Sequence, residues 1–495
     1  MAANFSELIN SLNIDDNSKA IMQKIVAELL CIITEKDKII AEQAKLIEEQ
    51  SLVIKNQGSE ILELQRQLNM DSSNSSFPPS SDMNKKKKKS EDGGTVTGGA
   101  SNRGGKPGHK GTTLNQVKKP DLIKKIMLEQ CSCGSRDLRI TGSYEARQEF
   151  DVEIKRVVTE HRLIHCKCVS CGMVSKPASD LPSNAFYSEK VKAYAVYMLD
   201  RHFMSYERLK EQFTDMFELA ISEGSISNWR REFANKLGKS YLNKLKQLLL
   251  ASKYINADET GINVAGNTIW AHVNCTDKYT LLQASPKRGS EGIKASGVLG
   301  NYSGFVIADG WSSYKGLATI RGIQSCFAHL FRYCVDIGEN YKQKLASKVL
   351  DFLHGLMEES KALNNAGIAN FSAKSRIKYN LQYDKLLKDG EVELKEHNYG
   401  KSHHTWRFLN RLKKEKSSVL RFLRHTFLPL TNNEAERSLR PLKVKQKISG
   451  TCLSLENAQE NLNIRSFIAT AKKQGQNVLA AMLKMFINPQ DFILI

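Results

Sequence analysis

Three carboxylates stand in settings that allow metal-dependent chemistry. Asp258 and Asp309 each follow a short apolar run that is typical of a buried strand, and Glu436 lies in a polar, basic stretch that is typical of a helix. Two carboxylates at strand ends and one on a helix can converge on two Mg²⁺ ions, which activate water or a sugar hydroxyl against a phosphodiester. The pattern therefore predicts chemistry on a nucleic acid.

Two neighbouring carboxylates compete for this role. Glu434 lies on another side of the predicted helix from Glu436. Glu259 directly follows Asp258, and successive strand residues face opposite ways, so we do not expect it in the site. Cations that could hold phosphates and balance charge follow Glu436, namely Arg437, Arg440, Lys443, Lys445 and Lys447.

The composition suits a multidomain protein with a polyanionic partner. A chain of 495 residues predicts three or four domains, and 73 Lys and Arg against 53 Asp and Glu give a formal charge of +20. This surplus favours a partner such as DNA, although charge alone does not separate DNA from RNA or an acidic membrane. We expect no membrane span and no secretory signal, because no apolar run is long enough and the N-terminus lacks basic and apolar signal regions.

An apolar residue recurs every seven positions through residues 1–70. The column comprises Val26, Ile33, Ile40, Ile47, Ile54, Ile61 and Leu68. A sustained heptad with intervening polar residues predicts a long helix that pairs in a coiled coil. A long amphipathic helix packed on its own protein is the alternative.

Residues 71–119 have the composition of a disordered basic linker rich in Gly, Ser and Lys. Next to DNA, its cations would contact phosphates. The candidates are Lys85, Lys86, Lys87, Lys88, Lys89, Arg103 and Lys110.

A cysteine cluster in residues 120–182 predicts a small zinc-binding module, with the alternative of reduced, unligated thiols. Two pairs supply the candidate ligands, and a Cys-x-x-Cys knuckle is one half of a structural zinc site. The pairs are Cys131 with Cys133, which is tighter than usual, and Cys168 with Cys171. His165 and Cys166 are spare ligands.

Residues 183–250 read as helices with the outline of a helix-turn-helix, although generic helical pairs look similar. Ser225 is the expected N-cap of the second helix. Its first turns carry the candidate DNA contacts Trp229, Arg230 and Arg231.

Strand-like runs follow at residues 253–257, 269–273, 279–283 and 305–308, with a helical piece around 289–300. Asp258 ends the first run and Asp309 the last, an order that matches a ribonuclease-H-like sheet. Residues 330–430 and 432–485 read as mainly helical.

Taken together, these motifs resemble the transposases of the insertion-sequence 66 family, a bacterial group with an Asp-Asp-Glu core. The resemblance covers nearly the whole chain. After the zipper it rests on Gly-Lys-Pro-Gly-His-Lys-Gly, the cysteine motif, Ala-Asp-Glu-Thr, Asp-Gly-Trp-Ser-Ser-Tyr, Cys-Phe-Ala-His and Asn-Asn-Glu-Ala-Glu-Arg-Ser-Leu-Arg-Pro. It implies Asp258, Asp309 and Glu436 as the metal-binding triad. Thr431, where the family commonly has Asp, and the short first cysteine pair depart from the pattern.

The resemblance implies a multidomain α+β fold with a ribonuclease-H-like α/β catalytic core and a helical insertion. The expected domains are a coiled-coil helix (1–70), the linker (71–119), a zinc-finger-like module (120–182), helix-turn-helix-like DNA binding (183–250), the catalytic core (251–334 and 426–475), the insertion (335–425) and a C-terminal helix (476–495).

The implied activity is Mg²⁺-dependent cleavage and strand transfer at the ends of an insertion sequence, with two Mg²⁺ ions (or Mn²⁺) and a structural Zn²⁺. The expected partners are DNA, further copies of the chain and accessory proteins of the same element, in the bacterial cytoplasm at the nucleoid. A structure-selective nuclease of the same fold and a catalytically inactive DNA-end-binding regulator are the alternatives.

Overall fold

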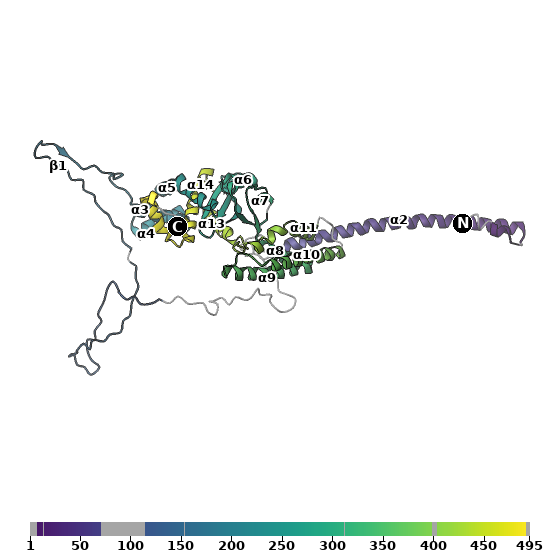
Figure 1. The fold of residues 1–495 in the computed structure, drawn as a ribbon, viewed down its shortest axis with the longest axis horizontal. Helices are drawn as coiled ribbons and strands as arrows, with labels where there is room; N and C mark the ends of the chain where they lie inside the picture. Colours follow the sequence, from purple (N-terminus) through teal and green to yellow (C-terminus); the bar gives the residue numbers. More distant parts are fainter. Residues whose placement is uncertain are drawn as a thin grey trace. The chain divides into compact units, whose positions relative to one another are not determined.

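The computed structural model describes residues 7–12, 14–70, 114–152, 154–310, 312–397 and 403–491. The fold is mixed α+β, with a long N-terminal helix and a mixed sheet (Figure 1). The chain divides into two compact units. The first comprises Met1–Asn84 and Ile323–Thr431, and the second comprises Lys85–Gly322 and Asn432–Ile495.

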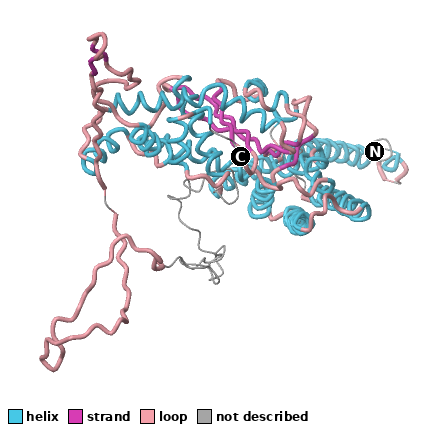
Figure 2. Tube along the Cα trace, turned by 60° about the vertical axis from the view of Figure 1, so that its left-hand side comes forward, coloured by secondary structure: helices cyan, strands magenta, loops and turns pink. Residues whose placement is uncertain are grey.

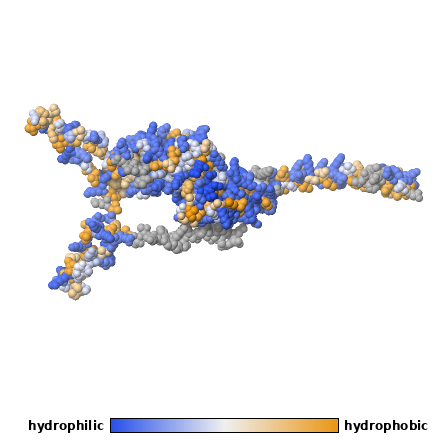
Figure 3. Space-filling model, in the orientation of Figure 1, coloured by the Kyte–Doolittle hydropathy of each residue, from blue (hydrophilic) through white to orange (hydrophobic). Residues whose placement is uncertain are grey.

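The first unit begins with α2 (Asp16–Asn69), a continuous helix of 54 residues. Asp15 caps it by accepting a hydrogen bond from the backbone N–H of Ser18 at 2.9 Å. Apolar heptad residues are exposed along much of the helix, with Ile40 at 61% and Ile54 at 69% (Figure 3). An exposed apolar stripe of this length has no partner within the described part of the unit.

The C-terminal end of α2 packs on its own unit, against α8 (Phe327–Tyr341). Arg66 forms an ion pair of 2.9 Å with Asp336, whose side chain is 2% exposed, and the hydroxyl of Tyr341 donates to Glu63 at 3.0 Å. The helix is therefore anchored at one end and exposed over the rest.

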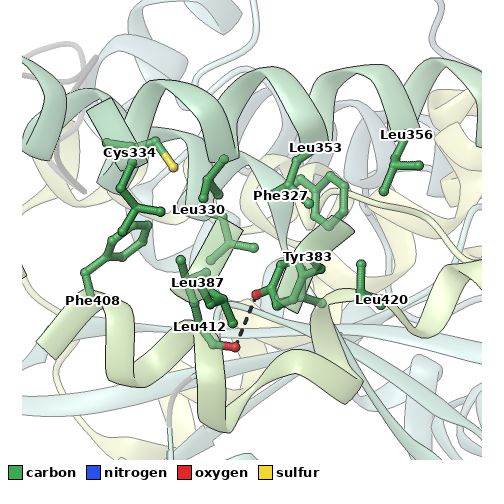
Figure 4. Close-up of a cluster of buried hydrophobic side chains, with 14 of the residues drawn as sticks. Phe327, Leu330, Cys334, Leu353, Leu356, Tyr383, Leu387, Phe408, Leu412 and Leu420 are labelled. Atoms are coloured by element: carbon green, nitrogen blue, oxygen red, sulfur yellow. Dashed lines mark hydrogen bonds between the residues drawn. The ribbon is translucent and has the colours of Figure 1, made fainter. Parts of the chain in front are cut away.

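The remaining helices of the first unit surround one apolar cluster (Figure 4). They are α8, α9 (Lys344–Asn365), α10 (Ala373–Glu396), α11 (His404–Lys414), α12 (Lys416–Val419) and η3 (Arg421–Arg424). The cluster's Tyr383 is fully buried, and its hydroxyl donates to the backbone oxygen of Leu412 at 3.1 Å. That hydrogen bond satisfies a polar atom that would otherwise be costly to bury.

The second unit starts with open loops over residues 114–188 (Figure 2). Their only regular structure among the described residues is a two-stranded hairpin of β1 (Cys166–Lys167) and β2 (Val174–Ser175). Apolar side chains here are exposed, for example Ile126 at 96%. The loops therefore form no core of their own.

Three helices follow: α3 (Glu189–Arg201), α4 (Tyr206–Phe217) and α5 (Glu223–Leu250). Ser205 caps α4, and Ser222 caps α5 by accepting from the N–H of Ser225. The prediction that Ser225 is the cap was wrong because α5 begins one turn earlier. Gly238, with φ of 49°, kinks α5.

The sheet has the order β5-β4-β3-β6-β7. Its strands are β3 (Tyr254–Val264), β4 (Asn267–Cys275), β5 (Thr280–Ser285), β6 (Phe305–Ala308) and β7 (Gly322–Ser325). The connection to β6 contains α6 (Ser290–Ala295) and η2 (Leu299–Asn301), and α7 (Ser312–Lys315) follows it. The four predicted strands are confirmed, whereas β7, where the chain passes from the second unit to the first, was missed.

Two helices from the C-terminal part of the chain pack against this sheet, α13 (Asn433–Ser449) and α14 (Leu455–Lys473). α15 (Val478–Ile487) packs against α3 and α5 and is followed by η4 (Pro489–Asp491). Side chains of α14 accept hydrogen bonds from outward-facing N–H groups of β5, at Thr280, Leu282 and Ala284. The helix thereby closes an edge that would otherwise offer itself to another strand.

None of the helices in the described parts of the chain combines the length and the apolar character that a membrane span requires.

Candidate active site

The sheet brings Asp258 and Asp309 to neighbouring positions. β3 and β6 are parallel, and Asn256 pairs with Ile307 in their register. Asp258 and Asp309 each stand two residues beyond this last parallel pair. β3 itself continues past Asp258, which pairs with Val273 of β4, as far as Val264, so the prediction that Asp258 ends its strand was wrong. Gly310 follows with φ of 86°, a conformation that favours glycine, so the chain turns directly after Asp309.

Helix α13 lies along one face of β3. Its buried residues Ala435, Leu439 and Leu442 pack in one cluster with Ile262 and Val264 of β3. Alternate strand residues share a face, so Asp258 points to the same side as Ile262 and Val264. Glu436, next to Ala435 on the helix, is therefore brought toward Asp258.

Glu434 and Glu436 have different neighbours. Glu434 forms ion pairs with Arg437 at 2.9 Å and with Lys473 at 3.5 Å. The side chain of Glu436 is 18% exposed and has Arg440 at 3.9 Å. The charge of Glu436, but not that of Glu434, is among the main influences on Asp258.

Crowding of carboxylates strongly perturbs Asp258. Burial raises its pKa most, followed by the charge of Glu259, and those of Asp309 and Glu436 add to the effect, against one backbone N–H that lowers it. The result is a pKa of about 8. Asp258 keeps some exposed surface, although protein fills most of the space around its carboxyl group. A cluster of this kind stores repulsion that a bound cation would relieve.

Glu259 occupies the opposite face of β3. It pairs across the sheet with His272, accepts from the hydroxyl of Tyr314 at 2.7 Å and contacts Arg288 at 3.2 Å. Strand alternation separates it from Asp258 as expected, yet its charge is still the largest electrostatic contribution to the raised pKa of Asp258. The prediction that the Glu259 side chain faces away from Asp258 is therefore confirmed, but it missed the effect of the Glu259 charge on the pKa of Asp258.

Sequence reasoning missed Tyr314 and Arg288. Tyr314 comes from α7, just after Asp309, and burial together with the charge of Glu259 raises its pKa well above the usual value. Arg288 stacks over the ring of Trp270 at 4.7 Å and is 47% exposed. The Asp-Gly-Trp-Ser-Ser-Tyr motif was the available signal for Tyr314, whereas nothing local distinguished Arg288.

The donor set of this cluster fits Mg²⁺ in chemical type, because hard divalent cations take carboxylate oxygens. Asp258, Asp309 and Glu436 would hold the ion, and burial together with the neighbouring carboxylates raises the pKa of Asp258. Over the residues that the structure describes, no three His, Cys, Asp or Glu side chains form a group able to hold a metal ion. The three carboxylates therefore match Mg²⁺ in donor type and are linked through their effect on the pKa of Asp258.

The cysteines do not form the predicted four-ligand zinc site. Hydrogen bonds within each pair lower the pKa of Cys131, through Cys133, and of Cys168, through Cys171. All four are free thiols, and no metal-holding group of three or more occurs among the described residues. Each pair forms its own tight turn, and the loops that carry the pairs have no core to bring them together.

The predicted DNA contacts divide by exposure. Trp229 is 7% and Arg230 is 4% exposed, and Arg230 is paired with Asp200 at 2.8 Å, so the expectation for these two is wrong. Arg231, the third predicted contact on α5, is exposed. Arg437 and Arg440 are 66% and 68% exposed, and the amine of Lys443 donates to the backbone oxygen of Gly261.

The predicted phosphate contacts also included Lys445 and the cations of the linker. Lys445, grouped with the phosphate-binding cations, donates instead to Asp200 and Asn461. The linker cations Lys85, Lys86, Lys87, Lys88, Lys89, Arg103 and Lys110 lie outside the described residues.

Two known protein families match parts of this chain. Residues 184–460, more than half of the chain, match the family described as Transposase IS66 family. The chain belongs to this family, and the matched region contains Asp258, Asp309 and Glu436. Residues 34–115 also match a family of unknown function (DUF6444). No curated protein matches the chain.

Proposed function

We propose that this protein binds the ends of an insertion sequence, cuts DNA there and joins the freed 3′ ends to target DNA. The observation that carries the proposal is the alignment of Asp258 and Asp309 along parallel neighbouring strands, with Glu436 on the helix that packs against β3. The strand order, with β3 parallel to β6 and antiparallel to β4, and β4 antiparallel to β5, supports a ribonuclease-H-like core.

In this proposal Asp258, Asp309 and Glu436 are the catalytic carboxylates. When bound, Mg²⁺ supplies a nucleophile of lowered pKa and stabilises the leaving oxygen. Arg437 and Arg440 project from the helix that carries Glu436 and are exposed enough to contact phosphates. Glu259, held by Tyr314 and Arg288, keeps negative charge beside Asp258 and so favours a cation there.

The other segments serve DNA binding and assembly. α4 and α5 form the helix-turn-helix-like reader, with Arg231 at the exposed surface. The exposed apolar stripe of α2 supports pairing of copies through a coiled coil, because a stripe of this length in water favours association. The domain division, with the insertion at 335–425 between parts of the core, belongs to the same proposal.

The decisive experiment is a strand-transfer assay with purified protein, Mg²⁺ and labelled DNA carrying the element's flanking ends. Asp309→Ala is the control. Metal-dependent joining that the variant loses is the expected result.

Other outcomes separate the alternatives. Cutting without joining would identify a nuclease. Binding of the ends without cutting, with and without accessory proteins of the same element, would identify a regulator. Unchanged joining by Asp309→Ala would exclude this set of catalytic residues.

A further inference from the structure

Two fully buried asparagines connect the strand of Asp258 to the helix of Glu436. Asn256 and Asn432 are both 0% exposed. The amide nitrogen of Asn256 donates to the amide oxygen of Asn432 at 3.0 Å, and the amide nitrogen of Asn432 donates to the backbone oxygen of Ala257 at 2.8 Å. We call this pair the amide bracket.

Both residues break a local rule at this place. Asn is disfavoured in strand interiors, yet Asn256 stands between Ile255 and Ala257 in a central strand. Asn432 occupies the N-cap position of α13, where an Asn side chain normally accepts from the first turn, but it makes no such bond. Forgoing a cap destabilises the helix. A buried polar pair that gives up local stabilisation is typical of a functional constraint.

The bracket sits at a fixed distance from both carboxylates. Asp258 is two strand residues beyond Asn256, or about 7 Å. Glu436 is four helical residues beyond Asn432, or about 6 Å. The strand and the helix run in the same direction, because Lys443 contacts Gly261 and Cys452 pairs with Val264 further along. The two offsets therefore place Asp258 and Glu436 alongside each other.

From this geometry we infer that Asn256 and Asn432 are positioning residues that set the separation of Asp258 and Glu436 for a divalent cation. The apolar contacts of Leu439 and Leu442 hold the helix on the sheet, but such contacts are non-directional and allow sliding. The directional amide hydrogen bonds fix the register at the end of the helix that carries Glu436, and the hydrogen bond from Lys443 to Gly261 does so further along. The inference rests on the proposed function of the carboxylates.

The test measures Mn²⁺ binding to the protein without DNA. Electron paramagnetic resonance reports the concentration of free Mn²⁺, and the metal-induced shift in melting temperature gives a second measure of binding. Asn432→Ala, Asn256→Ala and the double variant should each bind Mn²⁺ 10–100-fold more weakly, the loss typical for groups that orient metal ligands. The Mg²⁺ concentration that half-saturates DNA cutting should rise in parallel, while binding of DNA ends is kept.

Two controls separate positioning from stability. Asn433→Ala changes the exposed neighbour of Asn432 and should change nothing. Leu442→Ala removes apolar packing of α13 and should lower the melting temperature while leaving Mn²⁺ affinity intact. In the double Asn variant the losses of stability should be less than additive, because neither amide is left buried without its partner. The Mn²⁺ affinity of the double variant should nevertheless stay low.

Wild-type Mn²⁺ affinity in the double variant, or an equal loss in Leu442→Ala, would overturn the inference. Absence of Mn²⁺ binding by the wild-type protein would instead refute the proposed function of the carboxylates. The two failures are therefore distinguishable.

Discussion

Two aspartates of the second unit, Asp200 and Asp258, are both surrounded by protein, yet their pKa values are shifted in opposite directions. Burial raises the pKa of each. At Asp200 the charges of Arg230 and Lys445 more than offset this and lower its pKa to about 2, whereas at Asp258 neighbouring carboxylates add to burial and give about 8. Partners, not burial, decide the outcome.

The contrast separates a cluster that stabilises the fold from the proposed catalytic carboxylates. Asp200 joins α3 to α5, α13 and α14, through Arg230, Lys445 and the guanidinium of Arg465, which donates to its backbone oxygen at 2.7 Å. Its hydrogen bonds and charges stabilise the fold. The charges of the carboxylates around Asp258 raise its pKa, and a bound cation would relieve that repulsion.

The largest effect should follow from breaking the Asp200 cluster. Asp200→Asn leaves Arg230 and Lys445 buried without their counter-charge, and removing one partner of a buried pair costs about 3–5 kcal/mol. Urea unfolding should show this loss. Asp215→Asn, a change at an exposed position of α4, is the matched control and should have little effect. Equal stability of Asp200→Asn and wild type would refute the structural role.

The opposite sign is expected at Asp258. Its folded pKa lies above the ordinary value of 3.8, so ionisation favours the unfolded state, and stability falls as pH rises from about 4 to 8. Without metal, Asp258→Asn should therefore be more stable than wild type, by a margin that grows by up to about 1.4 kcal/mol per pH unit between pH 4 and 8.

Thermal melts in the presence of a chelator measure this difference. The advantage of Asp258→Asn should shrink as pH falls from 8 to about 4 and disappear below that, where the carboxyl is protonated in both states. A variant that is less stable than wild type at pH 8 would show that the carboxylate is held by a favourable partner instead.

Metal affinity should depend on pH for the same reason. Below about pH 8 the carboxyl of Asp258 holds a proton that a cation must displace. Mn²⁺ affinity should rise up to tenfold per pH unit between pH 6 and 8 and level off above. Calorimetry in two buffers of different ionisation enthalpy counts the released proton, and a flat profile would contradict the crowded-carboxylate description.

Local patterns in the sequence predicted much of the region around Asp258 and little of the Asp200 cluster. Apolar runs ending in Asp258 and Asp309 predicted both strands, because period and length are properties of a short segment. The Asp200 cluster joins residues from four helices far apart in the sequence, so no local pattern reveals it. Lys445 shows the consequence, since it lies in a basic run yet serves Asp200.

The same reasoning explains the misplaced DNA contacts. Arg230 and Arg231 are adjacent and chemically identical in the sequence, but the turn of α5 buries one and exposes the other. Helix periodicity could have separated them only if the buried face had been known. The amide bracket was equally hidden, because each Asn finds its partner across a gap of 176 residues.

The smallest effect should come from an exposed cation of α13. Arg437 is 66% exposed and pairs with Glu434, so Arg437→Ala should change stability by less than about 0.5 kcal/mol. If it contacts a phosphate, the slope of log affinity for DNA against log salt should fall by about 1. Arg230→Ala should give the reverse pattern, with a large loss of stability because Asp200 loses its ion-pair partner. An unchanged salt slope in Arg437→Ala would remove this residue from the DNA surface and restrict the contacts on α13 to Arg440 and Lys443.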